Sequence, residues 1–175
     1  ETLIDPVFLL TVKQWDRLLR YTPDTIGEPY LFLYTFGAGD EIYKLAEYVA
    51  EQKKLKLVVV CDKRVDGKHV TQLTNCGPLE FLRLVRNASF VCTTSFHGEA
   101  FSILFNRDFY CIGHPIYAQR NMDLAKLCGL EGRMVTEAED VQEVQGCAFG
   151  EVNWILEEKR KKSLEFLKRA IVENW

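Results

Sequence analysis

Residues 30–61 read YLFLYTFGAGDEIYKLAEYVAEQKKLKLVVVC, with two apolar runs on either side of an amphipathic segment. Residues 30–36 are a short aromatic and aliphatic run that predicts a strand. Residues 57–61 are a continuous apolar run, typical of a strand that is covered on both faces of a parallel sheet. Between them, apolar residues recur at helical spacing from Ile42 to Ala50, and Asp40 precedes them as a candidate helix cap. Strand, helix and strand in this order predict a β-α-β unit.

The alternation continues along the rest of the chain. Gly77-Pro78 marks the start of another predicted helix, because proline is favoured in a first helical turn. Apolar patterning then predicts a strand over 89–94, a buried helix over 98–105, a strand over 109–112, a helix over 121–128, an edge strand over 133–136 and a long charged helix over 152–175. The last helix is predicted to dock through Leu164, Leu167 and Ile171.

Two further segments lie outside this alternation. Residues 2–10 are predicted to be extended, and Thr11 with Gln14 to form a capping box that starts a helix to about residue 20. Residues 62–76 are polar and are predicted to form a loop.

Together these elements predict a single doubly wound, Rossmann-like α/β domain over residues 1–175, with a mainly parallel sheet. Such sheets bind ligands at the carboxyl ends of their strands. The loops that follow the strands are therefore the expected places for function, namely residues 37–40, 62–76, 95–98 and 113–120.

Composition excludes several classes of function. No apolar run approaches the roughly 20 residues that span a bilayer, and no basic and apolar leader stands at the N-terminus. The net charge is −3 with acidic and basic residues interleaved, so nucleic acid is not an expected partner. The six cysteines are scattered singly, without the spacing of a zinc site, as expected for core residues in a reducing compartment. We expect a cytoplasmic protein without membrane insertion or bound metal.

The turn Thr94-Ser95-Phe96-His97-Gly98 lies between a predicted strand and a predicted helix. Hydroxyls, an imidazole and the free N–H groups at a helix start favour an anion such as a phosphate or carboxylate. On the local pattern alone, it is equally consistent that Ser95 only caps the helix and that His97 packs beneath a loop.

Two other segments could contribute to an anion site. Arg120 follows the strand over 109–112 and can grip a carboxylate or phosphate with two hydrogen bonds, although solvated arginines are common. Gly37-Ala38-Gly39 loosely resembles a phosphate-binding turn, but it lacks the third glycine of a dinucleotide fingerprint and the lysine of a P-loop. NAD and ATP are therefore disfavoured as ligands.

Taken together, several segments resemble the C-terminal half of the polysaccharide pyruvyl transferase family. The matching segments are DPVFLLT at 5–11 with Trp15, PY at 29–30, GPLEFL at 77–82, NA at 87–88, SFHGEAFSI at 95–103, NRDF at 106–109, and Arg120. Their order and spacing cover most of the chain, and the block that contains Ser95 and His97 is the most specific.

This resemblance implies a GT-B-type arrangement of two Rossmann-like domains, in which the first domain holds most of the sugar acceptor and the second holds the donor. Residues 1–175 would be the C-terminal, donor-binding domain, and an N-terminal domain would belong to a longer parent. We expect the isolated chain to be inactive.

The resemblance also implies an enzyme that transfers a pyruvyl group from phosphoenolpyruvate to two hydroxyls of a glycan or lipid-linked sugar, in the biosynthesis of exopolysaccharide for the cell envelope. It implies no cofactor beyond this donor substrate, and at most a peripheral association with the inner face of the membrane. His97 is the candidate general acid or phosphate partner, since histidine ordinarily changes charge near neutral pH. The candidate donor-binding residues are Ser95, Gly98, Arg120, Glu80 and Gly37.

Some of these assignments have structural alternatives. Glu80 can orient a ligand, but a glutamate in a first helical turn also stabilises the helix dipole. Two positions depart from the family pattern: Asp108 stands where proline is frequent, and Glu99 stands where a small or hydroxylated residue is common. The second departure adds a carboxylate beside the proposed anion site, which predicts an altered donor or weaker affinity.

Two other functions fit the same sequence. The domain could bind a nucleotide-sugar, as a glycosyltransferase does, or hold a phosphate ligand without catalysing transfer. It could also serve mainly to pack against a partner domain. His97 discriminates among these hypotheses, because transfer needs its imidazole whereas simple binding could tolerate glutamine.

Overall fold

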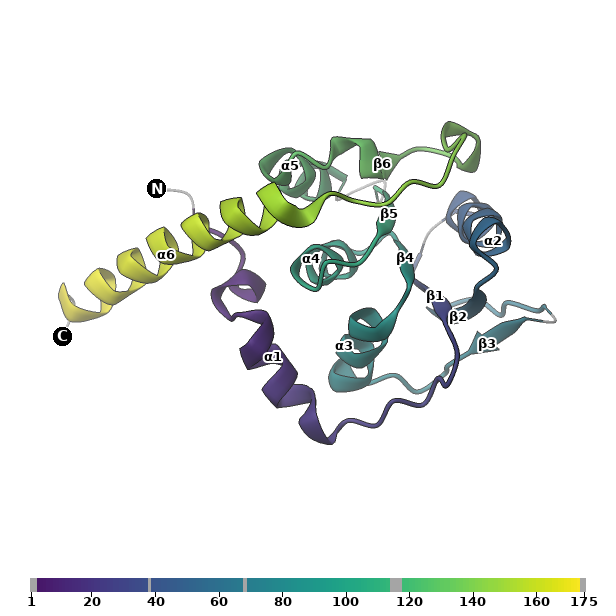
Figure 1. Ribbon diagram of the computed structural model, residues 1–175, viewed down its shortest axis with the longest axis horizontal. Coiled ribbons are helices and arrows are strands. Elements are labelled where there is room, and N and C mark those ends of the chain that lie inside the picture. The colour runs from purple at the N-terminus through teal and green to yellow at the C-terminus, as the bar shows by residue number, and fades with distance from the viewer. Residues whose placement is uncertain (1–2, 38, 68, 114–117, 174–175) are drawn as a thin grey trace.

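The domain is built on a six-stranded parallel sheet, seen here in a computed structural model (Figure 1). The structure describes residues 3–37, 39–67, 69–113 and 118–173. The strand order is β3-β2-β1-β4-β5-β6, the order of dinucleotide-binding domains. The strands are β1 (Tyr30–Thr35), β2 (Lys56–Cys61), β3 (Val70–Gln72), β4 (Phe90–Thr93), β5 (Phe109–Ile112) and β6 (Met134–Val135). This confirms the predicted doubly wound, parallel α/β fold.

Helices cover both faces of the sheet (Figure 1). Their bounds are α1 (Val12–Leu18), α2 (Glu41–Lys53), α3 (Pro78–Asn87), α4 (Phe96–Leu104), α5 (Ala118–Cys128) and α6 (Phe149–Glu173). Helix α2 packs on one face, and α3, α4 and α5 pack on the other, with α1 and the start of α6 beside them. As the sequence spacing predicted, the buried side of α2 runs from Ile42 to Ala50.

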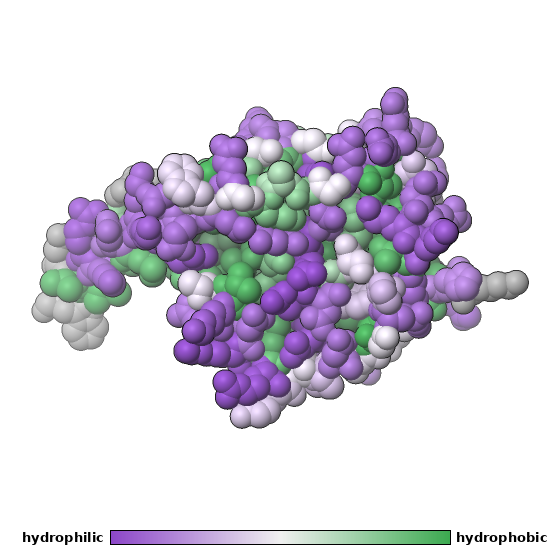
Figure 2. Space-filling model, in the orientation of Figure 1, coloured by the Kyte–Doolittle hydropathy of each residue, from purple (hydrophilic) through white to green (hydrophobic). Residues whose placement is uncertain are grey.

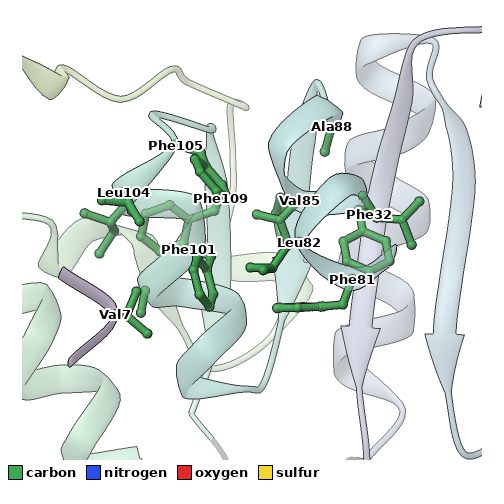
Figure 3. Close-up of a cluster of buried hydrophobic side chains, with 14 of the residues drawn as sticks. Val7, Phe32, Phe81, Leu82, Val85, Ala88, Phe101, Leu104, Phe105 and Phe109 are labelled. Carbon is green, nitrogen blue, oxygen red and sulfur yellow. The ribbon is translucent and has the colours of Figure 1, made fainter. Parts of the chain in front are cut away.

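Two apolar clusters fill the spaces between the layers. Phe32 and Phe109 project from the sheet toward α3 and α4, where they meet Phe81 and Phe101 (Figure 3). Alternate strand residues, such as Leu33, project to the opposite face toward α2. Burial of one such side chain contributes about 1.5–3 kcal/mol, so the central strands are held from both sides.

The chain changes direction between β1 and β4, which are neighbours in the sheet. After β1 the chain leads into α2 on one face, whereas after β4 it leads into α4 on the other. The loops that leave the two strands therefore diverge, and they open a crevice at the carboxyl edge of the sheet.

Two segments differ from the sequence prediction. The predicted loop over 62–76 contains β3, which pairs with β2 from Leu57↔Val70 to Val59↔Gln72. Three residues with no strong alternation carry little strand signal by themselves, and their hydrogen bonds to β2 supply the missing stabilisation. The predicted extended segment contains a 3₁₀ turn, Pro6–Leu9, because the Asp5 side chain accepts a hydrogen bond from the N–H of Val7.

The start of α1 is confirmed. The Thr11 side chain accepts from the N–H of Gln14, and the Gln14 side chain accepts from the N–H of Thr11. This reciprocal capping box begins the helix as the sequence pattern indicated. Asp40 precedes α2, but its side chain makes no capping hydrogen bond and instead pairs with Lys63 at 3.1 Å.

The predicted docking of α6 is wrong for Leu164 and Ile171, which are exposed, whereas Leu167 is half-buried. Val152, Leu156 and Ser163 are buried, whereas Ile171 is 61% exposed and Leu164 is 36% exposed. The last turns project from the body of the domain (Figure 1), and apolar atoms remain exposed at their end (Figure 2). Periodicity identifies the apolar face of a helix, but not how far the protein beneath that face extends. No helix among the described residues is long and apolar enough to cross a bilayer.

Candidate functional site

A pocket of about 340 Å³ lies in the crevice between the loops that follow β1 and β4. Its lining consists of Tyr34, Phe36, Thr94, Ser95, Phe96, Arg120 and Asn121. The pocket thus joins the end of β1, the start of α4 and the first turn of α5. This is the position at which doubly wound sheets bind ligands.

Hydroxyl groups fasten the two central strands beneath this pocket. Thr35 Oγ1 and Thr94 Oγ1 lie 2.8 Å apart in a buried hydrogen bond. The Thr93 hydroxyl donates to the carbonyl of Tyr34 at 2.7 Å and accepts the N–H of Ser95 at 3.0 Å. Since the Ser95 N–H has a partner and the Ser95 carbonyl accepts the N–H of Glu99 at 3.0 Å, the group that Ser95 can offer to a ligand is its hydroxyl.

Helix α4 begins at Phe96 and points its N-terminus into the crevice. Ser95 occupies the N-cap position, but its side chain makes no capping hydrogen bond. The early N–H groups of the helix are therefore available to an anionic oxygen, which the helix dipole would also favour.

Gly98 serves the close packing of this helix on the sheet. A Cβ atom at this position would lie 2.3 Å from Thr93 Oγ1. Gly98 is buried, and glycine lets the first turn of α4 approach the end of β4. The glycine predicted to bind the donor therefore has a structural role that needs no ligand.

Arg120 is held from two directions at the rim of the pocket. Its guanidinium stacks on the ring of Phe96, with Cζ 3.6 Å from the ring centroid. Its Nη2 donates to Asp5 Oδ2 at 2.8 Å. The Arg120 side chain is nevertheless 56% exposed, so nitrogen atoms that Asp5 does not engage remain accessible. A guanidinium held in this way is suited to bind a carboxylate or phosphate.

Glu99 lies beneath the pocket and away from its opening. The residue is fully buried, with Oε2 accepting from Asn121 Nδ2 at 2.6 Å. Burial raises the pKa of the Glu99 carboxyl to about 8, although the hydrogen bond from Asn121 opposes the shift. The raised pKa favours the neutral carboxyl at pH 7, which argues against the expectation that Glu99 adds a charge at the anion site.

His97 lines a neighbouring pocket rather than the one that holds Arg120. This second pocket measures about 480 Å³ and also contains Trp15, Cys76 and Phe101. The His97 side chain is exposed, and its ring meets Phe96 edge to face at 5.7 Å between centroids. Tyr34 lines both pockets. A ligand seated on Arg120 must therefore reach past this shared wall to contact the imidazole.

Gly37 and Glu80 lie outside the pocket that contains Arg120. Gly37 adopts a left-handed conformation with φ 61°, and its N–H donates to Asp62 Oδ2 at 2.9 Å. Its backbone donor is therefore occupied. Glu80 is exposed in the first turn of α3, where its carboxylate folds back beside Gly77. This placement agrees with the structural alternative, in which the glutamate interacts with the helix dipole.

The sequence prediction did not identify four residues of this region. Tyr34 and Phe36 were treated as parts of a strand, and Asn121 as the start of a helix. Asp5 lies 115 residues before its partner Arg120, so no local pattern connects them. The aromatic residues Tyr34 and Phe36 did carry a usable signal, because they stand at the carboxyl end of a predicted strand, where such sheets bind ligands.

The sequence profile of the polysaccharide pyruvyl transferase family matches residues 1–115. The chain belongs to the polysaccharide pyruvyl transferase family. The match ends between β5 and α5, so it includes the turn with Ser95 and His97 but not Arg120. In this family member, the assignment of Arg120 to the site therefore rests on its position in the structure and not on the family match. No curated protein matches the chain in sequence.

Solved structures confirm the fold of this pyruvyl transferase family member. The UDP-GlcNAc 2-epimerase of Methanocaldococcus jannaschii, crystallised with UDP-GlcNAc and UDP, superposes with a TM-score of 0.57 at 16% identity. The similarity covers 95% of this chain and 52% of the epimerase, so the chain spans about half of that protein. This likeness establishes a Rossmann-like, GT-B-like fold.

Proposed function

We propose that this chain is the donor-binding part of an enzyme that transfers a pyruvyl group from phosphoenolpyruvate to two hydroxyls of a sugar. The observation that carries the proposal is the pocket between β1 and β4, where Arg120 and the N-terminus of α4 face one space. Phosphoenolpyruvate carries a carboxylate and a phosphate, the two groups that an arginine and a helix start recognise. The residues that precede residue 1 in a longer parent would supply an N-terminal domain and most of the acceptor site.

The proposed reaction requires a proton donor and groups that bind anionic oxygens. A proton is added to the methylene carbon of phosphoenolpyruvate, which makes the neighbouring carbon electrophilic. Two sugar oxygens then bond to that carbon while its bond to the phosphate oxygen breaks. The two sugar hydroxyls release two protons. One replaces the proton that was added to form the methyl group, and the other leaves with inorganic phosphate.

We assign the roles from the position of each side chain. Arg120 would hold the carboxylate or phosphate, and the Ser95 hydroxyl with the free N–H groups of α4 would take further anionic oxygens. His97 would act as the general acid or as a partner of the phosphate from the adjoining pocket. Tyr34 would separate the two parts of the substrate.

The test is an NMR titration of the chain with phosphoenolpyruvate, with inorganic phosphate as a control. We expect saturable shifts of the amides of residues 94–98 and 118–121. The same titration of an Arg120→Ala variant should give weaker binding, whereas Lys126→Ala, on the exposed side of α5, serves as the matched control. Wild-type binding by Arg120→Ala, or no shifts with phosphoenolpyruvate, would contradict the proposal.

A nucleotide-sugar ligand is the second candidate. The epimerase with the similar fold was crystallised with UDP-GlcNAc and UDP, and crevices at the switch point of such sheets accommodate nucleotides. Titration with a UDP-sugar distinguishes the two candidates. Saturable shifts with the UDP-sugar alone would favour a glycosyltransferase-like or purely binding function over pyruvyl transfer.

A further inference from the structure

A basic groove of about 660 Å³ separates α1 from α3, well away from the proposed donor pocket. Its lining comprises Lys13, Asp16, Arg17, Arg20, Arg83, Arg86 and Asn87. Five of these seven side chains are cationic and one is anionic, although the chain as a whole has a net charge of −3. The groove is therefore positively charged, although the chain as a whole is negatively charged.

Helical spacing places these cations on facing sides of the groove. Lys13, Arg17 and Arg20 recur every three or four residues, so they share one side of α1 and the 3₁₀ turn that follows it. They span roughly 10 Å along the helix axis, at 1.5 Å for each residue. Figure 2 shows strongly hydrophilic side chains gathered over α1.

The opposite wall is held in a defined position. Arg86 binds the Asp16 carboxylate with two hydrogen bonds, at 2.9 and 3.3 Å. Arg83 donates through Nη2 to the carbonyl of Leu19, while its buried Nε has no hydrogen-bond partner in the described part of the chain. These contacts fasten α3 to α1 and fix the width of the groove.

Most of the positive charge in the groove is not neutralised. Asp16 balances Arg86, but Lys13, Arg17 and Arg20 form no ion pair with any described residue. Clefts lined by one sign of charge concentrate the opposite sign from solution.

The groove is separate from the proposed donor site. Neither the 340 Å³ pocket nor the pocket that contains His97 shares a lining residue with it. Helix α3 begins at the second of these pockets with Pro78. Arg83 and Asn87 lie roughly 8 to 14 Å further along its axis. A ligand in the groove would therefore leave both pockets free.

We propose that this groove is a second anion site, which binds a ligand that carries more than one phosphate group. A single phosphate is too small to contact cations spread along α1 and the 3₁₀ turn that follows it, whereas a diphosphate or a row of phosphates can engage several. Arginine binds phosphate oxygens with two parallel hydrogen bonds. Of the four arginines in the lining, Arg17 and Arg20 form no ion pair with a described residue, and the lining has no large apolar surface. The phosphates could belong to a soluble molecule or to lipid head groups.

The first measurement is a titration of the chain with inorganic pyrophosphate, followed through the amides of residues 12–20 and 83–87. We expect saturable shifts there, an affinity that falls as salt is raised, and persistence of these shifts in excess phosphoenolpyruvate. A parallel flotation experiment uses vesicles of phosphatidylcholine with and without phosphatidylglycerol. Binding of pyrophosphate supports a soluble ligand, and flotation with the anionic vesicles alone supports lipid phosphates.

The double variant Arg17→Gln/Arg20→Gln should weaken whichever binding is seen by at least tenfold. Both side chains are exposed, so the fold should be kept. The matched control is Arg64→Gln/Lys126→Gln, which removes the same charge from exposed positions outside the groove. Absence of both pyrophosphate and vesicle binding, or equal losses in the two double variants, would overturn the proposal. Neither result depends on whether phosphoenolpyruvate binds beside Arg120.

Discussion

Asn121 donates from Nδ2 to Glu99 Oε2 across 2.6 Å, and this bond joins a fully buried carboxyl to a side chain that lines the proposed donor pocket. The same Nδ2 also lies 3.4 Å from Cys111 Sγ in β5. Asn121 thereby ties the first turn of α5 to both α4 and the sheet. Arg120 is its neighbour in the chain, so the position of the guanidinium depends in part on this buried contact.

The first prediction concerns pH and the stability of the domain. The pKa of Glu99 is about 8 in the folded protein and about 4.5 for an ordinary glutamate. Between these values the unfolded chain has lost the proton that the folded chain keeps, so stability falls as pH rises from 5 to 8. The slope is at most about 1.4 kcal/mol for each pH unit. Below pH 4.5 and above pH 8, Glu99 causes no further change in the stability of the domain.

The measurement is the free energy of unfolding in urea at pH 5 and pH 8 for the wild type and Glu99→Gln. The free energy of unfolding of Glu99→Gln should rise relative to that of the wild type as pH rises, because the glutamine has no proton to lose. Glu47→Gln, on the exposed side of α2, controls for the loss of any carboxylate. Parallel pH profiles of wild type and Glu99→Gln would show that Glu99 is charged in the folded state.

The second prediction tests the packing of α4 on β4. Gly98→Ala places a Cβ atom against Thr93 Oγ1, and such overpacking costs about 1–3 kcal/mol. Gly150→Ala is the control, since nothing lies within 4 Å of a Cβ atom at that position. We expect the control to be neutral or slightly stabilising in thermal and urea unfolding. Equal stability of the two variants would contradict the structural role of Gly98.

The third prediction separates the two roles proposed for His97. In the full-length transferase proposed to contain this domain, His97→Gln should lower kcat at least about 100-fold if the imidazole is the general acid. Donor affinity should then be nearly unchanged, whereas a phosphate partner would instead show weaker donor binding. The fold should be kept because the side chain is exposed, and His69→Gln provides an exposed control. Normal turnover with normal affinity would remove His97 from the site.

The fourth prediction concerns the hold of Arg120 on the donor. Arg120→Ala should weaken phosphoenolpyruvate binding about 10- to 100-fold, since a hydrogen bond to a charged group contributes about 1.5–3 kcal/mol. Asp5→Asn keeps an oxygen that can accept the N–H of Val7 but removes the charge that pairs with Arg120. We expect a smaller loss of affinity for this variant, because Phe96 still supports the guanidinium. Isothermal titration calorimetry measures both effects, and a larger loss in Asp5→Asn than in Arg120→Ala would count against this arrangement.

The fifth prediction tests which part of α6 is docked. Leu156 is 3% exposed, so Leu156→Ala should lower the free energy of unfolding by about 2–5 kcal/mol. Ile171→Ala makes a similar truncation at a side chain that is 61% exposed, and its effect should stay within about 0.5 kcal/mol. Urea unfolding of the two variants provides the comparison. A large loss in Ile171→Ala would mean that the end of the helix packs in solution.

Local patterns in the amino-acid sequence were enough to predict the parallel fold and the place of the turn at Ser95. Apolar runs at 30–36 and 57–61 predict strands, and the spacing from Ile42 to Ala50 predicts the covered side of α2. Both are local patterns, because a side chain's direction follows from the repeat of its own strand or helix. The capping box of Thr11 is local for the same reason, since its partners lie three residues apart.

Which of the candidate residues lie together depends on how the helices and strands pack in three dimensions. Ser95 and Arg120 line one pocket and His97 the next, a division that depends on the angles at which α4 and α5 leave the sheet. The pair of Asp5 and Arg120 joins residues 115 positions apart, and the raised pKa of Glu99 results from burial by neighbouring elements. Such contacts depend on how whole elements pack against one another, and the sequence near each residue carries no record of that packing.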